Sequence, residues 1–329
     1  MQHRVITFSK NIFLPLTTVC RNRCGYCSFR TPVRDGCLMA QDDVETTLRH
    51  GAAIGCTEAL FTFGERPEEE PGFSEYLKPF GYTTILDYCE AMCRKSIEYG
   101  VLPHTNAGIL TFDEMERLRT VNASMGLMLE TTARIPAHAT SKGKEPEVRL
   151  AMIEDAGKLK IPFTTGLLLG IGETMADREE SLCAIRDIHR RYKNIQEIII
   201  QNFCPKPGTP MAGTPIPTTN EICKTIRMAR DILPGDIAIQ IPPNLIDAAS
   251  LIQCGVDDLG GVSPLTIDYV NPEHPWPAFE ELKTIAGGAE LKERLCIYPQ
   301  YIERGWYHSD LQPLINRLAQ TVKLRSSGP

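Results

Sequence analysis

Three closely spaced cysteines are the residues of this chain best suited to chemistry. Cys20, Cys24 and Cys27 form a C-x3-C-x2-C pattern directly after an apolar stretch. Cysteine thiolates are the usual ligands of cubane iron–sulfur clusters. Three thiolates from one tight loop would leave one of the four irons without a protein ligand, and an open metal position is where a small molecule can react. The spacing therefore predicts a [4Fe–4S] cluster with one open iron.

Zinc or purely structural cysteines are the alternatives to a cluster. Zinc sites more often use paired C-x2-C or Cys/His knuckles, and the next cysteine, Cys37, stands alone. Twelve cysteines in 329 residues are too few for a disulfide scaffold. The N-terminal run Met1–Arg4 leads toward a strand rather than a secretory leader. We therefore expect reduced thiols and a cytoplasmic location.

The other cysteines are expected to be small buried hydrophobic residues. They are Cys37, Cys56, Cys89, Cys93, Cys183, Cys204, Cys223, Cys254 and Cys296.

The bulk composition excludes several classes of protein. Hydrophobic residues make up 42% of the chain and charged residues 23%, which is typical of a globular protein. No apolar run reaches the ~20 residues of a membrane-spanning helix. The net charge of −6 lacks the basic surplus of nucleic-acid binders. We expect neither a membrane nor a nucleic acid as partner.

Short apolar runs alternate with longer helical patterns along the chain. Strands are expected near Ile12–Thr17, Glu58–Phe63, Val101–His104, Ser124–Glu130, Pro162–Leu169, Ile195–Gln201, Ile237–Ile241 and Asp258–Gly260. Helices are expected near Gln41–Ile54, Thr83–Tyr99, Phe112–Arg119, Glu145–Leu159, Met175–Tyr192, Thr218–Ile232, Leu245–Gln253 and Pro277–Ile285. Gly55 and Gly100 follow helical patterns, where a left-handed cap is favoured.

This alternation predicts an α/β fold with a parallel sheet, and its length favours a (β/α)8 barrel of the TIM type. We expect the barrel over residues 1–306, with the cluster loop at 19–37, and a C-terminal helix and tail over 307–329.

Barrel enzymes react at the C-terminal ends of their strands, so polar residues there should converge on the cysteine loop. His104 and Asn106 are candidates for substrate contact or proton transfer, because histidine titrates near neutrality; a structural histidine is the alternative. Gln201 and Asn202 could bind substrate, since amides both donate and accept hydrogen bonds.

Three further charged residues are candidates for ligand contacts. Glu65 can accept from an ammonium group, and a solvated acid is the alternative. Glu130 ends a strand, where a buried carboxylate needs a partner. Arg149 can hold a carboxylate through its two-point fork, and a helix-surface charge is the alternative.

The cysteine loop, with aromatic Tyr26 before its last cysteine, resembles that of the radical S-adenosylmethionine (SAM) enzymes. The resemblance implies that the open iron binds SAM and that an electron from the cluster yields a 5′-deoxyadenosyl radical, which takes a hydrogen atom from substrate. Phe63-Gly64-Glu65 is similar to the family's Gly-Gly-Glu-like turn that binds the SAM amino group, with Phe63 as a departure. The segment Gly166–Thr174, including Gly170, is similar to the one beside the adenine. By the same resemblance, Tyr26 lies near the adenine and Glu130 contacts the SAM ribose or amino group.

Within that superfamily, the chain resembles the family of 7,8-didemethyl-8-hydroxy-5-deazariboflavin (FO) synthase subunit 1 over about residues 10–320. The resemblance rests on Cys20–Pro32, Thr62–Glu68, Pro103–Gly108 and Met128–Thr132. It implies a carbon–nitrogen lyase of coenzyme F420 biosynthesis. The substrate would be 5-amino-5-(4-hydroxybenzyl)-6-(D-ribitylimino)-5,6-dihydrouracil, which loses hydrogen and ammonia as the middle ring closes. Gln201 and Asn202 would then face the uracil edge or the ribityl hydroxyls.

The implied partners are FO synthase subunit 2, which supplies this adduct, and a low-potential electron donor. A single cysteine triad fits the separate subunit rather than a fused enzyme. Two alternatives remain: a radical SAM enzyme on another substrate, of the menaquinone-pathway, tyrosine-lyase or hydrogenase-maturation type, and a non-catalytic iron–sulfur protein.

Overall fold

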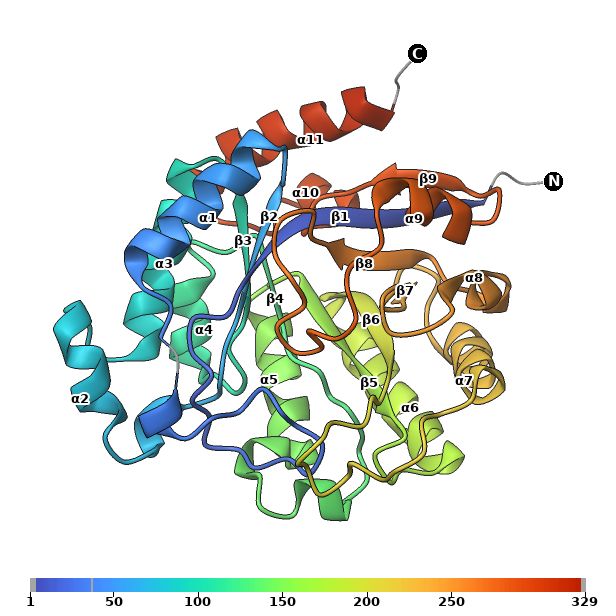
Figure 1. Ribbon diagram of the computed structural model, residues 1–329. Helices are drawn as coiled ribbons and strands as arrows, with labels where there is room; N and C mark the ends of the chain where they lie inside the picture. The colour runs from blue at the N-terminus through green and yellow to red at the C-terminus, as the bar shows by residue number, and fades with distance from the viewer. Residues whose placement is uncertain (1–3, 37, 327–329) are drawn as a thin grey trace.

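The computed structural model describes residues 4–36 and 38–326 (Figure 1). Cys37 and the end of the expected tail, 327–329, lie outside the described residues. The strands are β1 (Val5–Leu14), β2 (Glu58–Thr62), β3 (Leu102–Asn106), β4 (Ser124–Gly126), β5 (Phe163–Leu169), β6 (Ile195–Asn202), β7 (Ala238–Gln240), β8 (Asp258–Val262) and β9 (Glu290–Glu293). The helices are α1 (Gln41–Ala53), α2 (Phe73–Leu77), α3 (Ile85–Glu98), α4 (Phe112–Leu118), α5 (Pro146–Lys158), α6 (Met175–Tyr192), α7 (Thr219–Ile232), α8 (Ala248–Leu251), α9 (Phe279–Ile285), α10 (Pro299–Glu303) and α11 (Gln312–Ser326).

The strands form one parallel sheet in the order β2-β3-β4-β5-β6-β7-β8-β1-β9. β1 also pairs with β2, so β1 to β8 close into a barrel with helices outside it. This confirms the predicted (β/α)8 fold. Because the strands are parallel, the loops that follow β1 to β8 gather at one end of the barrel, including the cysteine loop after β1.

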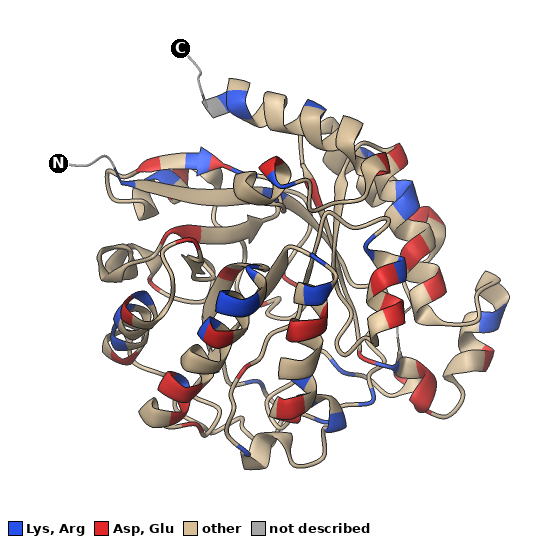
Figure 2. Ribbon diagram, turned by 180° about the vertical axis from the view of Figure 1, so that it is seen from behind, with Lys and Arg blue, Asp and Glu red and all other residues tan. Residues whose placement is uncertain are grey.

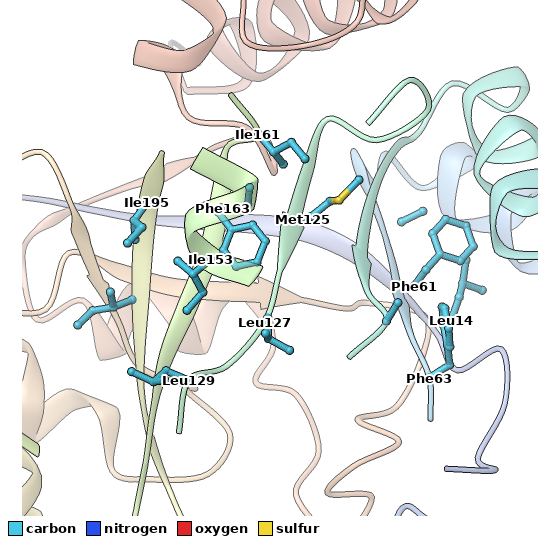
Figure 3. Packing of buried hydrophobic residues seen from close by; sticks show 14 of the residues in the cluster. Leu14, Phe61, Phe63, Met125, Leu127, Leu129, Ile153, Ile161, Phe163 and Ile195 are labelled. Atoms are coloured by element: carbon cyan, nitrogen blue, oxygen red, sulfur yellow. The ribbon is translucent and has the colours of Figure 1, made fainter. Parts of the chain in front are cut away.

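The core lies between the strands and the surrounding helices. Phe61 on β2, Met125 on β4 and Phe163 on β5 are fully buried, and Ile153 of α5 lies beside Phe163 in the same cluster (Figure 3). Burying such side chains contributes about 1.5–3 kcal/mol each. The outer faces of the helices carry both signs of charge (Figure 2). No helix of the described residues is long and apolar enough to span a membrane.

Local signals explain the helix boundaries. α3, α4, α6 and α7 each begin at a threonine cap with an acidic residue three positions later. Gly55 and Gly100 follow α1 and α3 with φ of 85° and 83°, as the sequence predicts.

The opposite end of the barrel is closed by a second hydrophobic cluster. α10 and α11 contribute Tyr301, Leu314 and Ile315, which pack with Leu102 of β3. Arg325 of α11 donates a 2.9 Å hydrogen bond to Gly55 O. The C-terminal helix therefore covers the end of the barrel away from the cysteine loop (Figure 1).

Several expected boundaries were wrong. β1 spans Val5–Leu14 rather than Ile12–Thr17, because its first residues pair with β9, a strand far along the chain that the sequence did not reveal. β4 ends at Gly126 rather than Glu130: Met128 O is bound by the Arg149 guanidinium, and Glu130 pairs with β5 again only through an isolated bridge to Leu167. The helix expected over Leu245–Gln253 reduces to α8 and a 3-10 turn at Ile252–Cys254. The segments α2, β9 and α10 were not predicted.

One expectation about cysteines was also wrong. Cys223 of α7 and Cys254 are paired as a disulfide, with Cα atoms 5.4 Å apart, rather than being free thiols. The 3-10 turn at Ile252–Cys254 packs against α7 and brings the two side chains together.

Candidate functional site

The cysteine loop is fixed from two sides by backbone contacts. Gly64 N donates to Thr17 O at 2.9 Å, and Arg21 N donates to Glu65 O at 2.9 Å. A Cβ on Gly64 would lie 1.9 Å from Val19 O, so only glycine permits this approach. On the other side, Gly25 N donates to Ala137 O at 2.8 Å. The turn after β2 therefore holds the loop in place by close backbone packing.

The three cysteines of the loop are free and half-buried. Cys20 Sγ accepts a 3.2 Å hydrogen bond from Glu65 N. Burial raises the pKa of Cys20 to about 11 and also raises the pKa of Cys24. No three His, Cys, Asp or Glu side chains of the described residues are arranged around a single metal ion. A cubane cluster does not need that arrangement, because each thiolate binds a different iron.

A charged cluster surrounds Glu130, which is buried and has a φ of 68°. Its carboxylate contacts the Lys144 ammonium and the Tyr26 hydroxyl, and lies 3.3 Å from His138 Nε2 and 3.9 Å from Arg149 Nη1. Burial alone would raise the pKa of Glu130, but Lys144, His138 and Arg149 hold it well below its usual range. Glu130 is therefore a permanent anion beside the cysteine loop.

The other residues predicted to contact SAM lie around this cluster. Arg149 is only 3% exposed and donates to Gly143 O at 2.8 Å, so it is no helix-surface charge. Glu65 is also buried, with its carboxylate bound to Arg21 Nε at 2.8 Å and Ile109 N at 3.1 Å. Gly170 follows β5 with a φ of 92°.

An apolar bed lies between the cysteine loop and the ends of β5 and β6. Tyr26 packs there against the cluster of Ile135, Leu168, Ile171 and Phe203. Burial, followed by the charge of Glu130, raises the pKa of Tyr26 well above its usual value. The Tyr26 phenol therefore stays neutral.

A cavity of about 400 Å³ opens into the barrel between these groups and the opposite wall. Its lining includes Cys27, Glu130, Lys144 and Arg149. His104, Asn106 and Gln201 line the same cavity. Such a volume suits a small-molecule ligand.

The alternation of side chains along β3 and β6 determines which of the remaining candidates face the cavity. Alternate residues of a strand face one side. His104 and Asn106 of β3 both line the cavity, as do Glu197, Ile199 and Gln201 of β6. Asn202 is therefore turned out of the cavity wall, and its Nδ2 donates to Leu245 O at 3.2 Å.

His104 forms a short chain of hydrogen bonds. Ser124 Oγ donates to Cys296 O at 2.7 Å, so its only proton is used. His104 Nδ1, 2.6 Å from Ser124 Oγ, must therefore carry a proton and donate it. Burial lowers the pKa of His104, so the ring is neutral and Nε2 holds a lone pair. Nε2 lies 3.1 Å from Asn106 Oδ1, so the Asn106 amide must turn about its χ2 to present its NH2 group to that lone pair.

Sequence reasoning missed several groups that support the loop. Asn22 Oδ1 accepts from Gly143 N at 3.0 Å, and Arg23 N donates to Ser141 Oγ at 3.0 Å. His138 and Lys144 belong to the same segment, which follows Glu130. The segment has no periodic hydrophobic pattern. The signal that the sequence offers is that the polar residues His138, Ser141 and Lys144 follow soon after a strand end.

Comparison of the sequence with known proteins shows the family to which this chain belongs. The sequence pattern of the radical SAM superfamily matches residues 14–183. The chain is 72% identical over 329 residues, all of both chains, to a 7,8-didemethyl-8-hydroxy-5-deazariboflavin synthase of Methanoregula boonei. It is 68% identical over 322 residues to a protein of the same name from Methanoculleus marisnigri, with 98% of this chain and 97% of that one covered.

Solved structures agree on the fold. Methylornithine synthase superposes with a TM-score of 0.65 at 15% identity, covering 95% of this chain and 86% of that one. A maturase of the [FeFe]-hydrogenase gives a TM-score of 0.67 at 14% identity, covering 96% and 69%. The chain thus belongs to the radical SAM superfamily and, within it, to the family of 7,8-didemethyl-8-hydroxy-5-deazariboflavin synthases.

Proposed function

We propose that the chain is the subunit 1 type of FO synthase, a carbon–nitrogen lyase of coenzyme F420 biosynthesis. Its substrate is 5-amino-5-(4-hydroxybenzyl)-6-(D-ribitylimino)-5,6-dihydrouracil, and its product is the deazaflavin FO. The full-length identity with proteins named for this product supports the reaction. The observation that carries the proposal is that a cysteine of the triad, Cys27, shares one cavity with His104 and Gln201.

The residues of the cysteine loop fit a cubane cluster. Cys20, Cys24 and Cys27 would each hold one iron, which leaves the fourth iron for SAM. The hydrogen bond from Glu65 N to Cys20 Sγ would stabilise a thiolate. With SAM bound, the cluster would supply the electron that starts the radical chemistry by which a hydrogen atom is removed from substrate.

The groups around Glu130 would hold SAM. Glu130, already ionised, accepts hydrogen bonds from the ribose or the amino group. Arg149 and Lys144 supply positive charge next to it, which suits the SAM carboxylate. The apolar bed beside Tyr26 and Gly170 would take the adenine, and the Gly64–Glu65 turn lies against the loop that presents the open iron.

Ring closure requires a group that accepts a proton. Atom balance between adduct and FO removes ammonia, one hydrogen atom, and a further proton and electron; the electron would return to the cluster, which gave one up in the cleavage of SAM. His104 lines the cavity and would take that proton at Nε2, because its Nδ1–H is committed to Ser124. Asn106 orients the same ring nitrogen, and Gln201 would bind the uracil edge.

Two partners follow from this reaction. A second radical SAM subunit, FO synthase subunit 2, supplies the adduct, and a low-potential donor reduces the cluster. The similarity to a hydrogenase maturase lies at 14% identity and supports the shared fold alone, so it does not favour that alternative substrate.

The test is an anaerobic assay of the reconstituted protein with SAM, a reductant and the adduct. We expect deazaflavin fluorescence together with 5′-deoxyadenosine, and neither product from the Cys24→Ala variant. SAM cleavage without fluorescence would assign another substrate. A full, reducible cluster that never cleaves SAM would favour a non-catalytic iron–sulfur protein.

A further inference from the structure

One wall of the cavity carries polar atoms that no described residue satisfies. Asn11 Oδ1, Thr62 Oγ1, Asn244 Oδ1 and Trp276 Nε1 are buried and lack a hydrogen-bond partner, and all four residues line the cavity. Asn11 is only 1% exposed. A buried polar atom without a partner is destabilising, so such a group of atoms at a cavity wall indicates a ligand that completes them. We call these four residues the polyol wall.

The amide of Asn244 is oriented by its neighbours. Its Nδ2 donates to Asp268 Oδ2 at 3.0 Å and to His274 O at 3.1 Å. Both N–H groups are therefore used, and Oδ1 is left as an acceptor. Asp268 is itself fixed, because its Oδ1 accepts from Val270 N at 2.9 Å and from Asn271 N at 3.0 Å. Asp268, in the loop after β8, thus orients Asn244, in the loop after β7, so that Asn244 Oδ1 can accept a hydrogen bond from a ligand.

Asn11 is confined by the packing of the barrel. It lies on β1, and a Cβ on the neighbouring Gly261 of β8 would come within 2.3 Å of Asn11 Nδ2. The amide therefore packs over the glycine backbone. Trp276 adds an N–H donor to the two carbonyl acceptors.

The charges of the cavity define what this wall can bind. Among the Lys and Arg side chains that line the cavity in the described chain, Arg294 is paired with Glu197 and Asp258, and Lys144 and Arg149 contact Glu130 and are assigned above to SAM. Beside the polyol wall stands the carboxylate of Asp268. A phosphate group would find acceptors and no free cation, whereas neutral hydroxyls can donate to the amide oxygens and accept from the indole.

We infer that the polyol wall binds the neutral ribityl chain of the substrate, with Asn11 and Asn244 as specificity-determining residues. This inference rests on the proposed function and assigns the ribityl chain to the side of the cavity formed by β1, β2 and the loops after β7 and β8. It also predicts that the enzyme rejects a substrate whose ribityl chain is phosphorylated.

The first test measures binding without turnover. Cluster-loaded enzyme lacking reductant is titrated calorimetrically with the adduct and with an analogue that carries a methyl group in place of the ribityl chain. Asn244→Ala should weaken adduct binding about tenfold, as expected for one lost hydrogen bond, and leave binding of the methyl analogue unchanged. The exposed Asn220→Ala variant should match wild type. Equal weakening of both ligands, or none, would overturn the inference.

A second variant separates ligand binding from folding. Asn11→Leu keeps the side-chain shape and removes the unsatisfied acceptor, so its Tm should equal or exceed that of wild type while adduct binding weakens about tenfold. Wild type should bind the 5-phosphate of the ribityl chain at least tenfold more weakly than the adduct. Adduct binding unchanged in Asn11→Leu, or tight binding of the phosphate ester, would contradict the assignment. Failure of the proposed function would appear differently, as absence of FO in the product assay.

Discussion

The two ends of the cavity differ in how completely their polar groups are satisfied. The floor consists of Thr164, Glu197 and Arg294, which line the cavity, with their partners Asp258 and Tyr298. Arg294 donates to Glu197 at 2.7 Å and to Asp258 at 2.6 and 2.7 Å, while Thr164 and Tyr298 each donate to Glu197 at 2.8 Å. The mouth comprises the cysteine loop, the Glu130 cluster and the polyol wall. It contains three free thiols, a left-handed glutamate and unsatisfied amide oxygens.

This difference distinguishes residues that stabilise the fold from residues that bind ligands. Buried charges that are fully paired need nothing further, so the floor is complete in the protein alone. Unpaired polar atoms and left-handed non-glycine residues are costly and persist where function needs them. The contrast therefore predicts that substitutions at the floor affect stability, whereas those at the mouth affect ligands.

The largest effect is expected at the mouth from Cys24→Ala. Removing one of three iron ligands should abolish cluster retention and lower 5′-deoxyadenosine formation at least ~1,000-fold, while the Tm of the cluster-free protein stays near that of wild type. Iron content and product analysis measure this, with Cys183→Ala on α6 as the matched control. A Cys24→Ala protein that still cleaved SAM would refute the triad.

At the floor, Arg294→Met should instead lower the stability of the protein. It leaves Glu197 and Asp258 as buried carboxylates without their cation, which should lower the free energy of unfolding by about 3–5 kcal/mol. Lys283→Met breaks an exposed ion pair with Glu280 and should cost under ~1 kcal/mol. Urea denaturation of both variants decides the point, and similar losses would remove the distinction between floor and surface.

His104 lies between the two regions, and its substitution should lower activity less than Cys24→Ala does. His104→Gln should lower kcat about 100-fold, the usual contribution of a general base, with little change in adduct binding. Because burial lowers the pKa of His104 below 6.5, the wild-type ring is neutral at pH 7. Activity should stay level from pH 8 to 6.5 and fall at lower pH, as the ring becomes protonated. A His104→Gln variant with the same acid limb would place the titrating group elsewhere.

Much of this architecture could be predicted from the sequence. The cysteine spacing, the alternation of apolar runs and helices, and the capping threonines are local features, and they located α3 to α7 and the loop after β1. Parity could also have separated Gln201 from Asn202, because Glu197, Ile199 and Gln201 share one face of β6.

Contacts between distant segments could not be predicted. The pairing of Val5–Phe8 with β9 joins segments more than 280 residues apart in the sequence, and no local pattern marks it. The Cys223–Cys254 disulfide and the Lys144–Glu130 contact likewise depend on how helices and loops pack. The polyol wall was missed for the same reason: Asn11, Asn244 and Trp276 come from three separate parts of the chain.

Hydrogen–deuterium exchange of the cluster-loaded protein, with and without SAM plus adduct, tests the contrast between mouth and floor most directly. We predict that the ligands slow exchange in the cysteine loop, in residues 130–145 and in the loops after β7 and β8, because these segments gain their missing partners. The floor strands should already be protected and should not change. Equal protection throughout the barrel, or none at the mouth, would contradict the account.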